Sequence, residues 1–186
     1  MHNSIIILSL IFFYCFNLFS NEVGSVTGWK LPRYVSLKSN ESNLRIGPSE
    51  NYPIILQFNK KNYPLEIIDE HEIWRKVNDI EGNKGWIHKN LLKGDRYAII
   101  NPLNKDIDVK VYSKPNGNLI GLIGRKNIVE IDVCLIDWCK IYYQEYKGWL
   151  SKDHLWGVYN NEKINIPIYQ KIVNIIWKIN FYKKDK

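Results

Sequence analysis

Short stretches in which apolar and polar residues alternate run through the middle of the chain. Residues 64–68 and 128–133 are rich in β-branched side chains, and the segments that begin at Trp74 and Trp138 follow them after tight turns. Such runs, bounded by turn-forming residues, are typical of β-strands. Between residues 30 and 160 no segment has its apolar residues at convincing helical spacing. The pattern therefore predicts an all-β fold.

One pattern occurs twice along the chain. WRKV at 74–77 and KGWI at 84–87 correspond to WCKI at 138–141 and KGWL at 147–150. Each copy holds roughly 50–60 residues, which is close to the lower limit for a domain that folds by itself. We predict two small barrels, with the tryptophan of each Gly-Trp pair in the core. Their predicted bounds are residues 33–93 and 108–158, with a linker at 94–107.

The N-terminus has a different pattern. Residues 5–19 are almost purely apolar, the first twenty residues include no Asp, Glu, Lys or Arg, and polar residues follow at 20–22. The apolar run is shorter than the roughly 20 residues of a membrane-spanning helix. We interpret residues 1–20 as a helical secretory signal peptide. Because the usual basic start is missing and Phe19 precedes the expected cleavage site, an uncleaved anchor remains the alternative.

The C-terminus, residues 159–186, is predicted to be a basic amphipathic tail. After Pro167 a helical wheel separates an isoleucine-rich face from a polar face that carries Lys171, Asn174 and Lys178. A helix of this kind can lie on an anionic membrane surface. It can equally pack across the barrels or against a partner, and both alternatives stay open. The apolar face contains Ile168, Ile172, Ile175, Ile176 and Ile179.

Charge changes this picture little. The 186 residues carry a formal net charge of +7, and the stretch from residue 164 onward contributes five lysines and one aspartate to it. The body of the chain is therefore close to balanced, and we predict no nucleic-acid binding. The aromatic content of 13% fits small β-barrels, which fill their interiors with large rings.

Cys134 and Cys139 flank a short turn. A spacing of five across a hairpin can bring two cysteines within bridging range, and an exported chain meets an oxidising compartment. We therefore predict a disulfide between them. The aligned residues of the first copy are Glu70 and Arg75, an opposite-charge pair that could clasp the same turn. The histidines and cysteines show neither metal-ligand spacing nor a nucleophile–base grouping, so we expect no metal, no cofactor and no catalysis.

Several motifs together resemble a known family. The first copy contains N-L-R-x-G-P at 43–48, Y-P-I at 52–54 and G-W at 85–86. These closely resemble the bacterial SH3-like domain, SH3b, and L-W-G-V at 155–158 resembles the end of the tandem version in proteobacterial exported proteins. The second copy departs from the pattern, because Tyr112-Ser113-Lys114 stands in place of Arg-x-Gly. This departure argues against a ligand role for that loop.

The resemblance implies a binding protein in the periplasm, and a membrane-bound tail would hold it near the inner membrane. SH3b modules often target proteins to peptidoglycan or its stem peptides, so we expect this ligand. A protein–protein adaptor or assembly factor that binds a peptide segment is the alternative. In SH3-like barrels the loop that holds Tyr52 borders the ligand groove, and Trp74 and Trp138 lie at turn exits where a ring can be half exposed. We expect these three aromatic residues to form ligand grooves.

Overall fold

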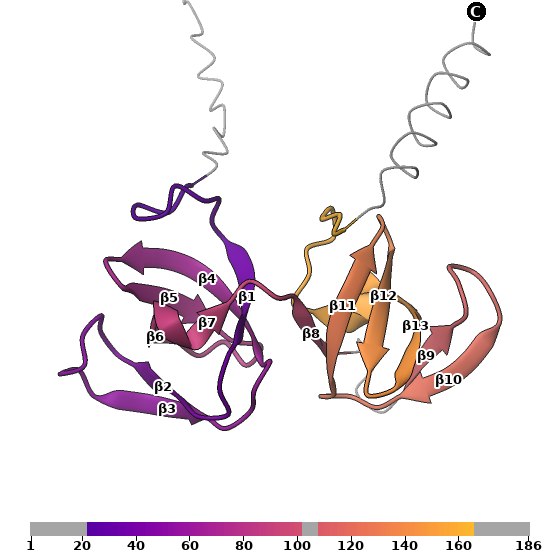
Figure 1. Ribbon diagram of the computed structural model, residues 1–186, viewed down its shortest axis with the longest axis horizontal. Coiled ribbons are helices and arrows are strands. Elements are labelled where there is room, and N and C mark those ends of the chain that lie inside the picture. The colour runs from indigo at the N-terminus through magenta and orange to yellow at the C-terminus, as the bar shows by residue number, and fades with distance from the viewer. Residues whose placement is uncertain (1–21, 102–107, 166–186) are drawn as a thin grey trace, which may run out of the picture.

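The computed structural model describes residues 22–101 and 108–165, and it places two antiparallel β-barrels one after the other (Figure 1). Each barrel is built on a seven-stranded sheet. The all-β tandem fold is therefore confirmed. The predicted signal peptide at 1–20 and the predicted helical part of the tail lie outside the described residues.

The first barrel contains one short 3-10 helix between its last two strands. Its sheet has the order β3-β2-β6-β5-β4-β1-β7. Its elements are β1 (Arg33–Leu37), β2 (Ser42–Arg45), β3 (Ile54–Phe58), β4 (Pro64–His71), β5 (Trp74–Asn78), β6 (Lys84–His88), η1 (Lys89–Leu91) and β7 (Leu92–Lys93).

The second barrel repeats this arrangement strand for strand. Its sheet has the order β10-β9-β13-β12-β11-β8-β14, so β1 corresponds to β8, β2 to β9, and so on. Its elements are β8 (Tyr97–Ile100), β9 (Val109–Tyr112), β10 (Leu119–Ile123), β11 (Ile128–Cys134), β12 (Trp138–Tyr143), β13 (Tyr146–Ser151), η2 (Lys152–His154) and β14 (Leu155–Trp156).

The structure moves both boundaries of the second barrel. The predicted linker 94–107 contains β8, which pairs with β11 and β14 and is the first strand of this barrel. Residues 159–164, predicted as the start of the tail, also belong to it, because Ile164 is buried and exchanges two backbone hydrogen bonds with Cys134. A barrel that began at residue 108 would leave the edges of β11 and β14 without the partner that β8 supplies.

The core follows the two-residue period of the strands. Ile87 and Leu150 are fully buried, whereas Trp86 and Trp149, which precede them, are half-buried on the opposite face. The prediction that these tryptophans lie in the core is therefore wrong. The adjacent Gly85 is buried, and a side chain there would collide with the Arg45 carbonyl and the Leu44 side chain. The close approach of β2 to β6 thus requires glycine.

The two barrels meet through an aromatic contact. Tyr34 of β1 stacks edge-on against Trp156 at 5.2 Å and lies 4.6 Å from the ring of Tyr159, measured between ring centroids. The Arg96 guanidinium lies 5.7 Å from the centroid of the Tyr34 ring and is held by an ion pair with Glu162. Aromatic and cation–π contacts of this kind favour one relative placement of the barrels.

One hydrogen bond at this interface crosses from barrel to barrel. The Tyr159 hydroxyl donates to a Glu66 carboxylate oxygen at 2.9 Å, and burial together with the Glu66 charge raises the pKa of Tyr159 well above its usual range. We expect Tyr159→Phe to lower the free energy of unfolding by about 1 kcal/mol, because the carboxylate loses a part-buried donor. Urea unfolding measures this change.

The matched control for Tyr159→Phe lies within the second barrel. The Tyr97 hydroxyl donates to Glu130 at 3.2 Å in an exposed position. Solvent can replace this bond, so Tyr97→Phe should change the free energy of unfolding by less than about 0.5 kcal/mol. Equal losses in the two variants would show that the bond between the barrels contributes no more to the free energy of unfolding than an exposed bond does.

Candidate ligand pocket of the first barrel

A tight loop connects β2 to β3 and borders the candidate site. Its backbone closes on itself, with the Tyr52 amide donating to the Ser49 carbonyl at 3.2 Å and the Ile46 amide to the Pro53 carbonyl at 3.1 Å. The Tyr52 ring lies so close over Gly47 that a Cβ there would be 2.6 Å from it. The glycine of the Arg-x-Gly-Pro motif is thus required by ring packing. The Tyr52 side chain itself is exposed.

A polar pocket of about 330 Å³ lies beside this loop, between β2, β3, the start of β5 and the end of β6. Trp74 begins β5 and forms part of the pocket wall, although only 6% of the residue is exposed. Its ring is covered edge-on by the His88 ring at 5.5 Å. The pocket is lined by Glu41, Ser42, Asn43, Arg45, Glu50, Gln57, Trp74, His88 and Leu91.

His88 is held in place by the backbone. Its Nδ1 accepts from the Asn90 amide at 3.2 Å and caps η1. In the neutral ring this bond leaves the proton on Nε2. His88 therefore contributes a fixed ring with a hydrogen-bond donor to the wall of the pocket.

The pocket carries charges of both signs. The Arg45 guanidinium donates to the Tyr52 carbonyl at 2.8 Å through Nη1, which fixes it between the loop and the pocket. Glu41 and Glu50 are exposed on the same wall. Arginine can bind a carboxylate through paired hydrogen bonds, and carboxylates bind ammonium groups. The arrangement suits a zwitterionic or amide-rich ligand rather than a purely apolar one.

The corresponding place in the second barrel has different chemistry. Tyr112 occupies the position of Arg45, since each pairs with the tryptophan of a Gly-Trp motif, and Ser151 occupies that of His88. The Tyr112 ring packs edge-on against Trp138 at 5.5 Å. The guanidinium of the first barrel is thus replaced by an aromatic contact, and the charge of Arg45 is not repeated at this position.

The predicted disulfide is present. Cys134 and Cys139 are bonded across the β11–β12 hairpin, where their Cα atoms pair in register, and both residues are fully buried. Glu70 and Arg75 pair in the same register of β4 and β5, with 3.5 Å between Oε1 and Nε. The same hairpin is therefore closed covalently in one barrel and by an ion pair in the other, as the alignment of the two copies predicts.

The part of the chain that the structure describes shows no group of three or more His, Cys, Asp or Glu side chains placed to hold a metal ion. In the same residues, neither short helix has the length and apolar character that crossing a membrane requires.

Comparison with protein families identifies the family of both barrels. The profile of the bacterial SH3 domain family matches residues 38–94 and 124–157. Both barrels are bacterial SH3 domains. The match to the second SH3 domain begins after β10, which agrees with the departure of its β9–β10 loop from the Arg-x-Gly pattern. A search of curated proteins finds no match.

Solved structures give a distant likeness. NlpC2 and NlpC1 from Trichomonas vaginalis match with 20% and 19% identity and TM-scores of 0.30 and 0.28, over 67% and 72% of this chain. The chain spans about half the length of these two proteins, 48% of each. Endolysin LysPBC5 CBD matches with 16% identity and a TM-score of 0.29, over 67% of this chain and 92% of its own.

The three predicted groove residues lie in different surroundings in the structure. Trp74 lines the pocket of the first SH3 domain, but it is buried rather than half exposed. Tyr52 is exposed and touches the pocket only through its carbonyl bond to Arg45. Trp138 lies in the other domain and is half-buried. The sequence did not single out Arg45, Glu50 and His88 as pocket residues, although Arg45 belongs to the Arg-x-Gly-Pro motif. Only the register of β2 against β6 brings Arg45 and His88 to one pocket.

Proposed function

We propose that this chain is an exported, non-catalytic protein whose first SH3 domain binds peptidoglycan through its stem peptides. The observation that carries the proposal is the polar pocket around Trp74, which places Arg45, Glu50 and His88 beside a fixed indole. Stem peptides contain free carboxylates, free amines and many amide groups. A pocket with both charges and several neutral hydrogen-bonding groups complements such a ligand.

The proposed compartment is the periplasm. Residues 1–20 predict export, and the buried Cys134–Cys139 disulfide supports it, because structural disulfides persist mainly in oxidising compartments. The membrane contact predicted for the tail remains a proposal. Flotation of the full chain with anionic vesicles, compared with a chain truncated after residue 165, tests it; equal flotation of both would contradict it.

A sacculus pull-down tests the ligand. We expect the purified full-length chain to sediment with peptidoglycan sacculi at physiological salt. Arg45→Gln and Glu50→Gln should each weaken this binding by about tenfold, since each removes a charge-assisted hydrogen bond. Both side chains are at least partly exposed, so neither change should unfold the domain. Circular dichroism of each variant checks the fold.

Charge-matched variants outside the pocket provide the control. Lys84→Gln and Glu81→Gln alter exposed residues that do not line it and should leave binding unchanged. An equal loss in all four variants would mean that sacculi attract the chain by net charge alone. If the wild-type chain stays in the supernatant, the stem-peptide proposal is wrong and a protein partner becomes the ligand to seek.

A further inference from the structure

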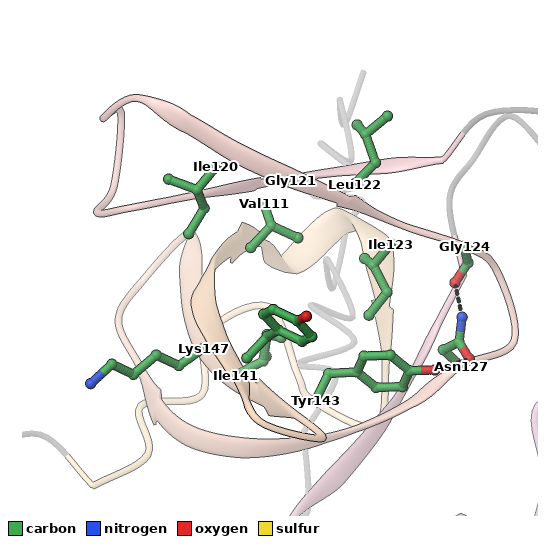
Figure 2. A pocket seen from close by; sticks show the side chains of 11 residues that line it. Val111, Ile120, Gly121, Leu122, Ile123, Gly124, Asn127, Ile141, Tyr143 and Lys147 are labelled. Atoms are coloured by element: carbon green, nitrogen blue, oxygen red, sulfur yellow. Dashed lines mark hydrogen bonds between the residues drawn. The ribbon is translucent and has the colours of Figure 1, made fainter.

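The second SH3 domain contains an apolar cavity. It has a volume of about 350 Å³ and lies between the β9–β10 ribbon and the hairpin of β12 and β13 (Figure 2). Figure 2 shows Val111, Ile123 and Ile141 pointing toward a common space, with the Tyr143 ring at its side. The volume falls in the range of sites that take a small ligand or a single large side chain.

Comparison of the two domains explains the cavity. The strand register aligns each lining position with a residue of the first domain, and at four positions the second domain has the smaller side chain. The pairs are Leu44 and Val111, Leu56 and Gly121, Phe58 and Ile123, and Tyr63 and Asn127, the last pair aligned by equivalent backbone hydrogen bonds to Leu37 and Ile100.

Those larger side chains fill the first domain. Leu56 packs on its core, and Phe58 and Tyr63 lie ring against ring at 5.1 Å. In the second domain a Cβ at Gly121 would meet nothing within 4 Å.

Two lining positions change in the opposite direction, since Ile141 stands in place of Val77 and Tyr143 in place of Asp79. A cavity of about 350 Å³ remains beside them. Unfilled apolar space is costly for a structural core and useful where a ligand completes the packing.

The polar groups of the cavity restrict the ligand. The Tyr143 hydroxyl donates to the Asn127 amide oxygen at 2.9 Å, and the Asn127 amide nitrogen donates to the Gly124 carbonyl at 2.9 Å, so these groups satisfy one another. Among the described residues that line the cavity, Lys147 carries a charge and none carries a carboxylate. The complementary ligand is an apolar group with a negative charge a few ångströms from it.

The surroundings of the cavity suit an extended peptide. β10 is the last strand of its sheet, and its five residues, L-I-G-L-I, include no charged side chain. Ile120, Leu122 and Tyr146 are 54%, 61% and 74% exposed at the rim. An uncharged, apolar edge strand is a ready template for a further strand, and proteins that do not use such an edge usually protect it.

We propose that this cavity and the edge of β10 bind the C-terminus of a protein partner. The last residue of the partner places a bulky apolar side chain in the cavity and its terminal carboxylate beside Lys147, while the preceding residues pair with β10. A terminal residue fits because it carries the apolar group and the charge within the dimensions of one cavity. This site is separate from the Trp74 pocket and does not depend on the proposed stem-peptide binding.

Titration of the full-length chain with short peptides tests the proposal. The probe is acetyl-Ser-Thr-Val-Phe with a free carboxylate, followed through the methyl NMR signals of Val111, Ile123 and Ile141. We expect saturable shifts of these signals. The same peptide with a C-terminal amide, and one ending in glycine, should each bind about tenfold more weakly. The absence of shifts at these methyl groups with the first peptide would overturn the proposal.

Gly121→Leu gives the matched variant, because it restores the residue that fills the first domain. It should abolish the shifts while leaving the fold intact, and it should raise the free energy of unfolding by about 1 kcal/mol through added apolar burial and loss of a strand glycine. Leu119→Ala, on the same strand but outside the cavity, should bind normally. Unchanged binding to Gly121→Leu would overturn the site.

Lys147→Gln offers a second comparison that removes the charge and keeps the apolar side chains of the cavity. It should weaken the free-acid peptide about tenfold and leave the amide unchanged. Equal effects on both peptides would contradict the proposed contact between Lys147 and the carboxylate.

Discussion

Glu70→Gln is expected to lower the free energy of unfolding by about 3 kcal/mol, because it removes a fully buried carboxylate that several segments share. The Glu70 side chain is 0% exposed and forms ion pairs with Arg33 and Arg75. Its oxygens also accept from the Val26 amide at 3.1 Å and the Thr27 amide at 2.8 Å. A neutral amide cannot replace these charge-assisted bonds, and it places a donor where donors already converge.

The effect has a defined pH dependence. Hydrogen bonds from Arg33, Thr27 and Val26 outweigh burial and lower the pKa of Glu70 from 4.5 to about 2. Because the folded-state pKa is the lower one, the carboxylate stabilises the fold fully above pH 4.5, and this stabilisation is lost as the pH falls toward 2. Thermal unfolding of the wild type should therefore become easier over this range, whereas Glu70→Gln should show a smaller dependence.

Glu72→Gln is the matched control for Glu70→Gln. Glu72 lies two residues away in the β4–β5 turn and is exposed. Its change should alter the free energy of unfolding by less than about 0.5 kcal/mol and leave the acid sensitivity as in the wild type. If Glu70→Gln were as stable as this control at pH 7, the buried carboxylate would not hold the N-terminal segment to the first SH3 domain.

The contacts of Glu70 show how far the sequence could predict the fold. Alignment of the two copies predicts that Glu70 faces Arg75, because strand register is encoded in the repeated Trp and Gly-Trp positions. It does not predict that Arg33 and the turn at residues 25–28 close over the same carboxylate. Those contacts join segments separated by 37 or more residues, and the segments before β1 have no counterpart in the repeat.

The candidate pocket, too, could be predicted from the sequence only in part. Family motifs predicted which loop borders a groove, and the structure places Arg45, at the end of β2 before that loop, at a polar pocket. The exposure of Trp74 was predicted wrongly, since a turn exit alone does not reveal that the His88 ring covers it. The apolar cavity of the second SH3 domain was equally hidden, because residues of β9, β10, β12 and β13 line it and only strand pairing brings them together.

Divergence of the two barrels therefore concerns function more than architecture. Topology, the 3-10 helices and the close β2–β6 approach are kept, whereas residues around the two cavities differ in charge and size. The first domain keeps a filled core and a polar pocket; the second has an aromatic pair at that place and an open apolar cavity elsewhere. Such a tandem is suited to hold two chemically different ligands at a fixed separation, since the Tyr34, Trp156 and Tyr159 contact sets the placement of the domains.

Removal of the disulfide should have the second large effect on stability. The double variant Cys134→Ala/Cys139→Ala is expected to lose about 2 kcal/mol in the free energy of unfolding, from the loop-closure entropy of a very short loop. Cavity formation adds to this loss, because both cysteines are fully buried in the core of the second SH3 domain. The loss should also loosen Ile164, whose backbone bonds to Cys134 tie the end of the domain to β11.

Urea unfolding and hydrogen exchange measure these two consequences. Exchange of the Ile164 amide should become faster in the double variant, while amides of β4 and β5 in the first domain, whose hairpin is closed by Glu70 and Arg75, should keep their protection. Ile136→Ala changes an exposed residue in the same turn and should have almost no effect, which separates the bond from the turn. Unchanged unfolding of the wild type under reducing conditions would contradict a stabilising disulfide, because the first domain contains no bond that a thiol could reduce.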